Sequence, residues 1–319
     1  GAAPAGRGAT WAPPRYDAEH TESAFLTRRA LEWLERELDA RGGAAAGDPW
    51  CAHLSYLRPH PPYVVPAPYN DMFDPAQVPA PVRRADPKAE AELHPFVAAA
   101  LGIVASPPDR VDQDQLRATY YGMIAEVDHQ LGVLVDGLAE RGQLDDTLLI
   151  VTSDHGEQLG DHWLIEKLGF FDQSFRIPLI VRWPAMTGAP GRTVDAFTEN
   201  VDVMPTILEL CGGEPPAFCD GASLRPFLDG ELSGPEAPPR WRTAVHTEYD
   251  FRMPTSRAVE ELLGIRQDQC AVSVLRDRSG KYVQFAGGLP PLFFDLDDDP
   301  AELNDLAADP AMAPRLLRY

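Results

Sequence analysis

The sequence predicts an α/β fold, in which a mostly parallel sheet is flanked by helices and followed by a small C-terminal antiparallel α+β subdomain. Segments with the apolar spacing of helices alternate with short aliphatic runs such as residues 148–151. These runs are almost continuously apolar, as is typical of strands that helices cover on both faces. Beyond about residue 240, strand-like runs follow one another with only short turns. We therefore expect an α/β core over residues 1–240 and an antiparallel subdomain over residues 241–319.

Three segments have the spacing of amphipathic helices. In residues 21–43, apolar residues recur at every fourth position, and Gly42 is the expected stop. A long helix is expected over residues 112–142, with Asp112 as its N-cap. A third helix should run from an Asp202 cap to Gly212. The expected buried positions are Leu26, Ala30, Leu34 and Leu38 in the first helix, and Leu116, Tyr120, Met123, Val127, Leu131, Leu134 and Leu138 in the second.

Short apolar runs predict the strands. The core strands are expected at residues 50–57, 147–152 and 176–184, and the C-terminal strands at residues 241–251, 269–277, 280–286 and 291–300, before a final short helix. Cys51 lies in the first of these runs and is expected to be a buried thiol. The four cysteines lack the spacing of a zinc site, and no signal-peptide pattern is present. These features favour a reducing compartment and a cytoplasmic location.

Composition limits the classes of partner. The chain has 28 basic and 49 acidic residues, a net charge of −21. Nucleic acids and anionic membrane surfaces need a positive protein face, so neither is expected as a partner. The apolar runs are too short to cross a bilayer, so no membrane-spanning segment is expected either. A small anionic ester can still bind through a few local cations, and a homo-oligomer remains an open alternative.

The most informative segment is TSDHGEQLGDHWLIEK, residues 152–167. Asp154 and His155 directly follow a predicted strand, and ligands of α/β sheets bind beyond the carboxyl ends of strands. A carboxylate and an imidazole at this position are well placed to chelate one divalent cation. Gly156 would allow a sharp turn and a close approach to the ligand. The alternative interpretation makes Asp154 a helix N-cap and His155 an ordinary turn residue.

Two further cations suit an anionic tetrahedral group. Lys167 lies downstream in the same segment, and His60 lies in a proline-rich loop after the strand expected at residues 50–57. Together with a metal ion, a lysine and a histidine could neutralise the charge that builds up on oxygen during displacement. Taken singly, Lys167 could be a solvated surface charge and His60 a structural residue.

These residues resemble motifs of the sulfatases and related hydrolases of the alkaline phosphatase superfamily. The resemblance continues through RIPLIVRWP, VDVMPTILELCGG, CDGASLRPFLDG and FFDLDDDPAELNDLA. The segments TESAFLTRRALEWL, HLSYLRPHPPYVVPAPYNDMF and HTEYDFR resemble the phosphonate monoester hydrolase/phosphodiesterase branch more narrowly. The resemblance implies a metal-dependent hydrolase of phosphonate monoesters or phosphodiesters. Two alternatives are an arylsulfatase-type sulfuric ester hydrolase and an inactive anion-binding member of the family.

The same resemblance implies roles for individual residues. Asp154 and His155 match the second pair of metal ligands, and Lys167 matches the lysine that contacts the nucleophile and the substrate's charged oxygens. His60 matches the histidine that binds the anion or protonates the leaving group, whereas His162 would lie behind the ligands. One divalent metal ion is implied as cofactor, with Mn2+ or Ca2+ preferred and Zn2+ as an alternative. A histidine beside the aspartate favours Mn2+ over Ca2+.

The family's nucleophile is a formylglycine, made from the first residue of a Cys- or Ser-x-Pro-x-Arg motif. None of Cys51, Cys211, Cys219 and Cys270 fits this motif, and the first metal-binding strand is not recognisable. We therefore expect the motif to be absent from this chain, and the chain to be an N-terminally truncated fragment that carries about half of an active site.

Overall fold

The structure is a computed structural model that describes residues 13–40, 49–184, 191–229, 238, 240–252 and 257–319. The chain forms two compact units, each assembled from separate stretches of sequence. The first unit comprises residues 1–81, 105–147 and 158–166, and the second comprises residues 82–104, 148–157 and 167–319. The expected boundary near residue 240 does not coincide with this division and stays a prediction.

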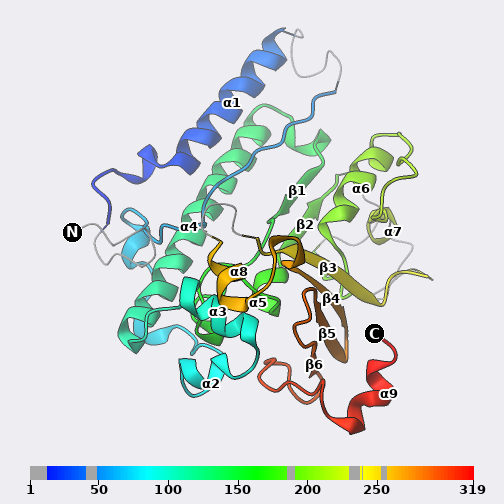
Figure 1. Cartoon of the computed structure of the whole chain (residues 1–319). Coiled ribbons are helices and arrows are strands. Elements are labelled where there is room, and N and C mark those ends of the chain that lie inside the picture. Colours follow the sequence, from blue (N-terminus) through cyan, green and yellow to red (C-terminus); the bar gives the residue numbers. More distant parts are fainter. Residues whose placement is uncertain (1–12, 41–48, 185–190, 230–237, 239, 253–256) are drawn as a thin grey trace. The chain divides into compact units, whose positions relative to one another are not determined.

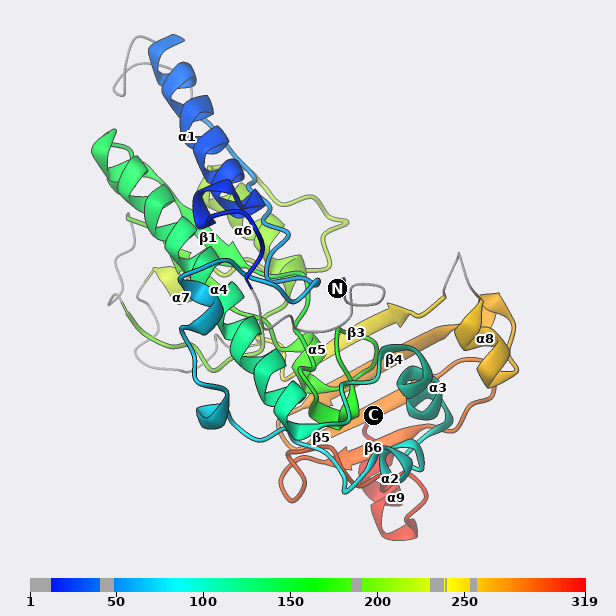
Figure 2. The same cartoon turned by 90° about the vertical axis from the view of Figure 1, so that its left-hand side faces the viewer.

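Two helices dominate the first unit, where α1 (Glu22–Ala40) lies alongside α4 (Arg110–Glu140) (Figures 1 and 2). Both predicted helices are thereby confirmed. Gly137 of α4 allows the close packing, because a β-carbon there would lie 2.5 Å from a methyl group of Leu31. The predicted stop at Gly42 falls outside the described residues.

The N-terminus of α4 differs from the prediction. The helix starts at Arg110, and Asp109 rather than Asp112 is its N-cap. The Asp109 carboxylate accepts hydrogen bonds from the backbone N–H groups of Val111 (2.8 Å) and Asp112 (3.4 Å). These two N–H groups belong to the first turn, where no backbone carbonyl is available to accept them.

The strand predicted at residues 50–57 is not formed, because within the described residues no strand pairs with it. Side-chain hydrogen bonds hold this extended segment instead: Trp50 Nε1 donates to Gln143 Oε1 (3.1 Å), and the Tyr56 hydroxyl lies 2.8 Å from Thr27 Oγ1. Cys51 is exposed, so the expectation of a buried thiol is wrong. Apolar alternation alone does not provide the hydrogen-bonded neighbour that a strand requires. The 3₁₀ turns of this unit are Ala18–His20, Tyr69–Asp71, Pro75–Gln77, Leu144–Asp146 and Asp161–Trp163.

The second unit contains the C-terminal sheet, in the antiparallel order β3-β4-β5-β6. Its strands are β3 (Ala244–Asp250), β4 (Ala271–Asp277), β5 (Gly280–Phe285) and β6 (Leu292–Asp295). All four predicted C-terminal strands are therefore present. Helix α3 (Pro95–Val104) covers one face of the sheet (Figure 2), where Phe96 packs 5.3 Å from Phe285 between ring centroids. The buried aromatic cluster around this contact also includes Phe170, Phe251 and Phe294.

A second sheet consists of β1 (Leu149–Thr152) and β2 (Leu179–Arg182), which pair antiparallel. The prediction of a mostly parallel sheet is thus not met, since every strand pair in the described residues is antiparallel. A parallel pair needs a crossover connection, usually a packed helix, whereas the only α-helix between β1 and β2 is the four-residue α5 (Asp172–Phe175). The apolar character of both strands carried no information about their direction.

Short helices complete the second unit. They are α2 (Pro87–Ala91), α6 (Val203–Leu210), α7 (Arg225–Leu228), α8 (Ala258–Leu263) and α9 (Ala313–Leu316), with 3₁₀ turns at Asn200–Asp202, Gln267–Gln269 and Pro310–Met312. Asp202 is the residue before α6, as predicted, but its side chain does not cap the helix. Its buried carboxylate instead accepts the Ala222 N–H (2.8 Å) and pairs with Arg242. Among the described residues, no helix has the length and apolar character needed to cross a bilayer.

Candidate functional site

The turn after β1 carries Asp154 and His155. Hydrogen bonds from two other segments of the second unit hold its backbone: Asn200 Nδ2 donates to the Ser153 carbonyl (2.8 Å), and the Gly156 N–H donates to the Ser174 carbonyl (2.8 Å). Within the turn, the His155 N–H donates to Asp154 Oδ1 (3.0 Å). These hydrogen bonds fix the backbone of the turn that carries the two potential metal ligands, Asp154 and His155.

Gly156 is required here because of a close approach between backbone segments. A β-carbon at this position would lie 2.0 Å from the Gln173 carbonyl oxygen, which no side chain can tolerate. The sequence predicted that this glycine would permit approach to a ligand. In the structure it permits the close approach of the turn to α5, and its approach to a ligand stays a prediction.

Hydrogen bonds at both ring nitrogens define the tautomer of His155. Nδ1 lies 2.9 Å from the Gly156 carbonyl oxygen, which can only accept, so Nδ1 carries the proton. Nε2 therefore presents its lone pair, and the Lys167 ammonium donates to it at 2.7 Å. A carbonyl bonded to the far nitrogen is the usual arrangement for a metal-binding histidine.

The donors fit one divalent ion in part. His155 Nε2 and Asp154 Oδ2 are 3.6 Å apart, which allows both atoms to bind a single ion at about 2 Å each. The Asp154 side chain is 87% exposed, so an ion can reach it. Lys167 Nζ lies on the Nε2 lone pair, however, so metal binding requires the ammonium to move away. Within the described part of the second unit, no third carboxylate, thiol or imidazole completes the site.

The structure thus brings together three of the four predicted site residues: Asp154, His155 and Lys167, all in the second unit. His60 belongs to the first unit, is half-buried, and has Nδ1 3.0 Å from the Pro61 carbonyl oxygen. His162 is fully buried in the 3₁₀ turn Asp161–Trp163 of the first unit. The predicted roles of His60 and His162 stay predictions.

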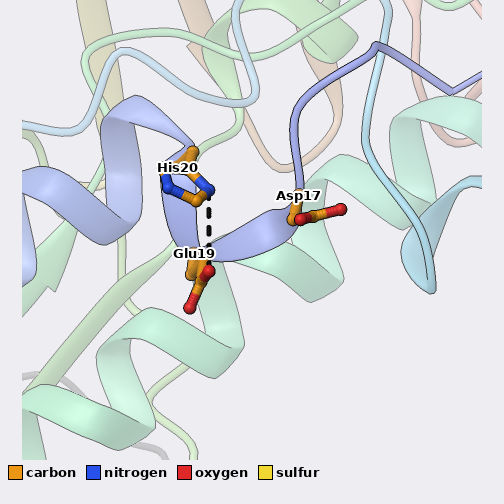
Figure 3. Close-up of side chains that lie close together, drawn as sticks. All are labelled: Asp17, Glu19 and His20. Atoms are coloured by element: carbon orange, nitrogen blue, oxygen red, sulfur yellow. Dashed lines mark ion pairs between the residues drawn. The ribbon is translucent and has the colours of Figure 1, made fainter.

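A second group of metal-type donors, which sequence reasoning did not identify, lies at the 3₁₀ turn Ala18–His20, just before α1. Ligand atoms of Asp17, Glu19 and His20 lie within 4.8 Å of one another, and all three residues are exposed. His20 Nδ1 lies 3.7 Å from Glu19 Oε1. Figure 3 shows these two side chains facing each other, whereas the Asp17 carboxylate points away from them. Exposed acidic groups are common without a bound ion, so we assign this group no function.

One segment contradicts the expectation that the nucleophile motif is absent. Ser106-Pro107-Pro108-Asp109-Arg110 has the spacing Ser-x-Pro-x-Arg. The structure gives it a structural role at the start of α4: Asp109 caps the helix and Arg110 pairs with Asp114. Ser106 is buried, and its hydroxyl accepts a hydrogen bond from Gln113 Nε2 (3.4 Å). We therefore assign Ser106 no catalytic role.

Comparison with known proteins places the chain in a family. The family model "Sulfatase" matches residues 2–213, and the model "N-sulphoglucosamine sulphohydrolase, C-terminal" matches residues 160–316. The crystal structure of the phosphonate monoester hydrolase of Agrobacterium radiobacter superposes with a TM-score of 0.89 at 42% identity, over 98% of this chain and 62% of that chain. This similarity confirms the α/β sulfatase fold.

Two curated relatives agree. The multifunctional alkaline phosphatase superfamily protein PehA of Trinickia caryophylli is 44% identical over 98% of this chain and 60% of its own length. The choline-sulfatase of Rhizobium meliloti is 32% identical over 91% of this chain and 51% of its own length. The chain thus spans between half and two thirds of the length of these relatives. It belongs to the sulfatase family of the alkaline phosphatase superfamily.

Proposed function

We propose that the intact protein is a metal-dependent hydrolase of small anionic esters, with phosphonate monoesters and phosphodiesters as its first substrate class. The observation that carries this proposal is the fixed turn after β1, which presents the Asp154 carboxylate, the His155 Nε2 lone pair and the Lys167 ammonium together. The similarity to PehA and to the phosphonate monoester hydrolase supports the substrate class. The choline-sulfatase relative makes sulfate esters the second candidate.

Asp154 and His155 would hold the metal ion, for which we propose Mn2+ or Ca2+, with Zn2+ as an alternative. When bound, such an ion supplies Lewis acidity and offsets negative charge on the reacting oxygens. Further ligands have to come from outside the pair formed by these two residues. We propose a formylglycine as the nucleophile, as the family resemblance implies.

The other proposed roles belong to residues of this chain. The Gly156 carbonyl accepts a hydrogen bond from His155 Nδ1 and so keeps the lone pair of Nε2 available to a metal ion. Lys167, once displaced from Nε2, would place its ammonium on a charged oxygen of the substrate and stabilise the charge that develops there. We propose His60 as the group that binds the anion or protonates the leaving oxygen.

Metal removal and restoration test this function. The full-length enzyme is stripped with a chelator and assayed with an aryl phosphonate monoester, an aryl phosphodiester and an aryl sulfate that share one leaving group. Turnover should disappear and return with Mn2+ or Ca2+, and the phosphonate or the phosphodiester should be the best substrate. Turnover that persists after complete metal removal would contradict the proposal.

Two variants form a matched pair for this test. His155→Ala should lower Mn2+ affinity at least about 100-fold, since loss of a ligand should exceed the typical effect of losing an outer-shell partner. His20→Ala removes an exposed histidine from the Asp17, Glu19 and His20 group and should leave both metal affinity and turnover unchanged. A protein that binds the ester but never turns it over, with or without metal, would favour the inactive anion-binding alternative.

A further inference from the structure

The second unit contains a group of charged residues, two of them buried and two half-buried, that the proposed reaction does not use. Lys281 of β5 is 1% exposed, and so is Glu302, which follows β6; Asp172 is the first residue of α5. We propose that these three residues, with Arg276 of β4, form a positioning cluster for the turn that carries Asp154 and His155. The structural part of this inference stands alone, whereas its consequence for metal binding rests on the proposed function.

The bonds of the cluster end on the segment that begins α5. Lys281 Nζ lies 2.5 Å from Asp172 Oδ1, pairs with Glu302, and donates to the Phe170 carbonyl (3.1 Å). Arg276 supplies a second cation to Asp172 at 3.0 Å. Two cations therefore balance two carboxylates, which is the condition under which buried charges are tolerated.

Glu302 also fixes the backbone of the same segment. Its Oε2 accepts the Asp172 N–H (3.1 Å), so the cluster holds both the side chain and the main chain of this residue. Glu302 itself has φ of 58°, in the left-handed region that non-glycine residues rarely adopt. Backbone strain of this kind persists only where the surrounding structure over-determines it. The cluster and its hydrogen bonds provide that constraint.

Helix α5 transmits this fixed position to the turn. The Ser174 carbonyl accepts the Gly156 N–H (2.8 Å), and the missing β-carbon of Gly156 would lie 2.0 Å from the Gln173 carbonyl oxygen. The turn is therefore in direct backbone contact with α5. A shift of α5 by even a few tenths of an ångström toward Gly156 would have to move the turn. The strands β4 and β5, which carry no proposed catalytic residue, thus determine where His155 and Asp154 lie.

The atoms that the cluster contacts indicate that it positions the turn rather than stabilises the fold in general. A buried ion pair adds little net stability compared with well-packed apolar residues. This cluster, however, directs its bonds onto the Phe170 carbonyl and the Asp172 N–H, both within four residues of the carbonyl that holds Gly156. Removing the cluster should therefore loosen the turn more than it loosens the sheet.

The test compares Lys281→Met with a matched control, Arg315→Met, in the full-length protein. Arg315 pairs with Asp295 on the neighbouring strand β6 and donates to the Ser279 carbonyl, so its loss also removes an ion pair from the edge of this sheet. The milder variant Arg276→Met removes only the second cation of Asp172 and serves if Lys281→Met fails to fold. The measurements are hydrogen exchange at the Gly156 and Val274 amides, the melting temperature, and the Kd for Mn2+.

We expect Lys281→Met to speed exchange at Gly156 by about tenfold or more relative to Val274 of β4, because exchange reports local opening. Arg315→Met should change the two sites equally. The Kd for Mn2+ should rise about tenfold in Lys281→Met. Loss of a residue that supports a metal ligand typically weakens metal binding by about 10- to 100-fold, and the cluster acts on His155 only through α5. Equal exchange changes at both sites, or an unaltered Mn2+ Kd, would overturn the inference. A wild-type protein that binds no divalent metal would count against the proposed function, while the exchange comparison would still decide the structural part.

Discussion

His155 shows how single residues prepare this site. One ring nitrogen donates to the carbonyl of the next residue, and the other accepts from Lys167. The Lys167 ammonium therefore lies on the lone pair that would bind the metal ion we propose. Metal binding would release the ammonium, which makes it available to an anionic substrate. Under the proposed function, the metal ion and the Lys167 ammonium would thus compete for His155 Nε2.

Gly156 gives a prediction at this scale. Gly156→Ala places a β-carbon against the Gln173 carbonyl, so we expect the free energy of unfolding to fall by about 1–3 kcal/mol. Urea denaturation followed by circular dichroism measures the change.

Gly102→Ala is the matched control. It lies in helix α3 of the same unit, where the added methyl would sit at an ordinary 3.8 Å from Leu262. Alanine favours a helix interior over glycine by about 1 kcal/mol, so this variant should be neutral or more stable. A Gly156→Ala protein as stable as the Gly102→Ala protein would show that the turn can move away from α5.

At the scale of elements, a buried hydrogen bond between Thr21 and Glu126 connects the start of α1 to α4. Thr21 Oγ1 donates to Glu126 Oε1 (2.7 Å) and accepts the Ala24 N–H (3.2 Å), so one hydroxyl both caps α1 and satisfies a buried carboxylate. Glu126 is 1% exposed. A carboxylate in this environment is costly unless it is hydrogen-bonded. The pair therefore determines where α1 begins along α4.

Thr21→Val tests this pairing. Valine keeps the shape of threonine but removes the donor, so we expect a loss of about 1–3 kcal/mol in the free energy of unfolding. Thr21→Ser keeps the hydroxyl and loses one methyl group, which should cost about 1 kcal/mol or less. Chemical denaturation of both variants measures the difference. Equal losses in the two variants would mean that the methyl group, not the hydrogen bond, matters here.

At the scale of the whole molecule, acidity should affect stability through Asp172. Burial by itself raises the pKa of Asp172, but Lys281 and Arg276 outweigh it and lower the pKa from 3.8 to about 2. The unfolded chain therefore binds more protons than the folded chain between these two values. The resulting stabilisation is fully present above about pH 4 and is lost as the pH falls toward 2, by about 2 kcal/mol.

Urea unfolding between pH 2 and 5 should show this loss in the wild-type protein and a weaker one in Asp172→Asn. Asp268→Asn is the control, because Asp268 pairs with Arg266 on the surface, where both side chains are mostly exposed, and exposed pairs contribute little. Burial raises the pKa of Glu302 above the ordinary glutamate value of 4.5. The unfolded chain therefore loses this proton first as the pH rises above 4.5, so Glu302 lowers the stability of the folded protein there. If the free energy of unfolding falls equally toward pH 2 in the wild-type and Asp172→Asn proteins, Asp172 is not the source of the loss.

The sequence by itself determined those features that depend on neighbours along the chain. Apolar spacing correctly predicted α1, α4 and α6 and the four C-terminal strands. An element that buries one face needs apolar residues at its own repeat, and this repeat is visible in the local sequence. The grouping of Asp154, His155 and Lys167 was also predictable, since one short segment carries all three. The same segment carries the family resemblance.

Only the tertiary structure decided what depends on distant parts of the chain. The apolar runs of β1 and β2 are the same whether the strands are parallel or antiparallel. Residues 50–57 have the pattern of a strand, but no strand pairs with them in the described chain. The positioning cluster joins Asp172 to Glu302, 130 residues away, through charges that would each read as surface residues. No local pattern encodes such a pairing, because the free energy that selects it is gained only when the folded chain brings both groups out of water together.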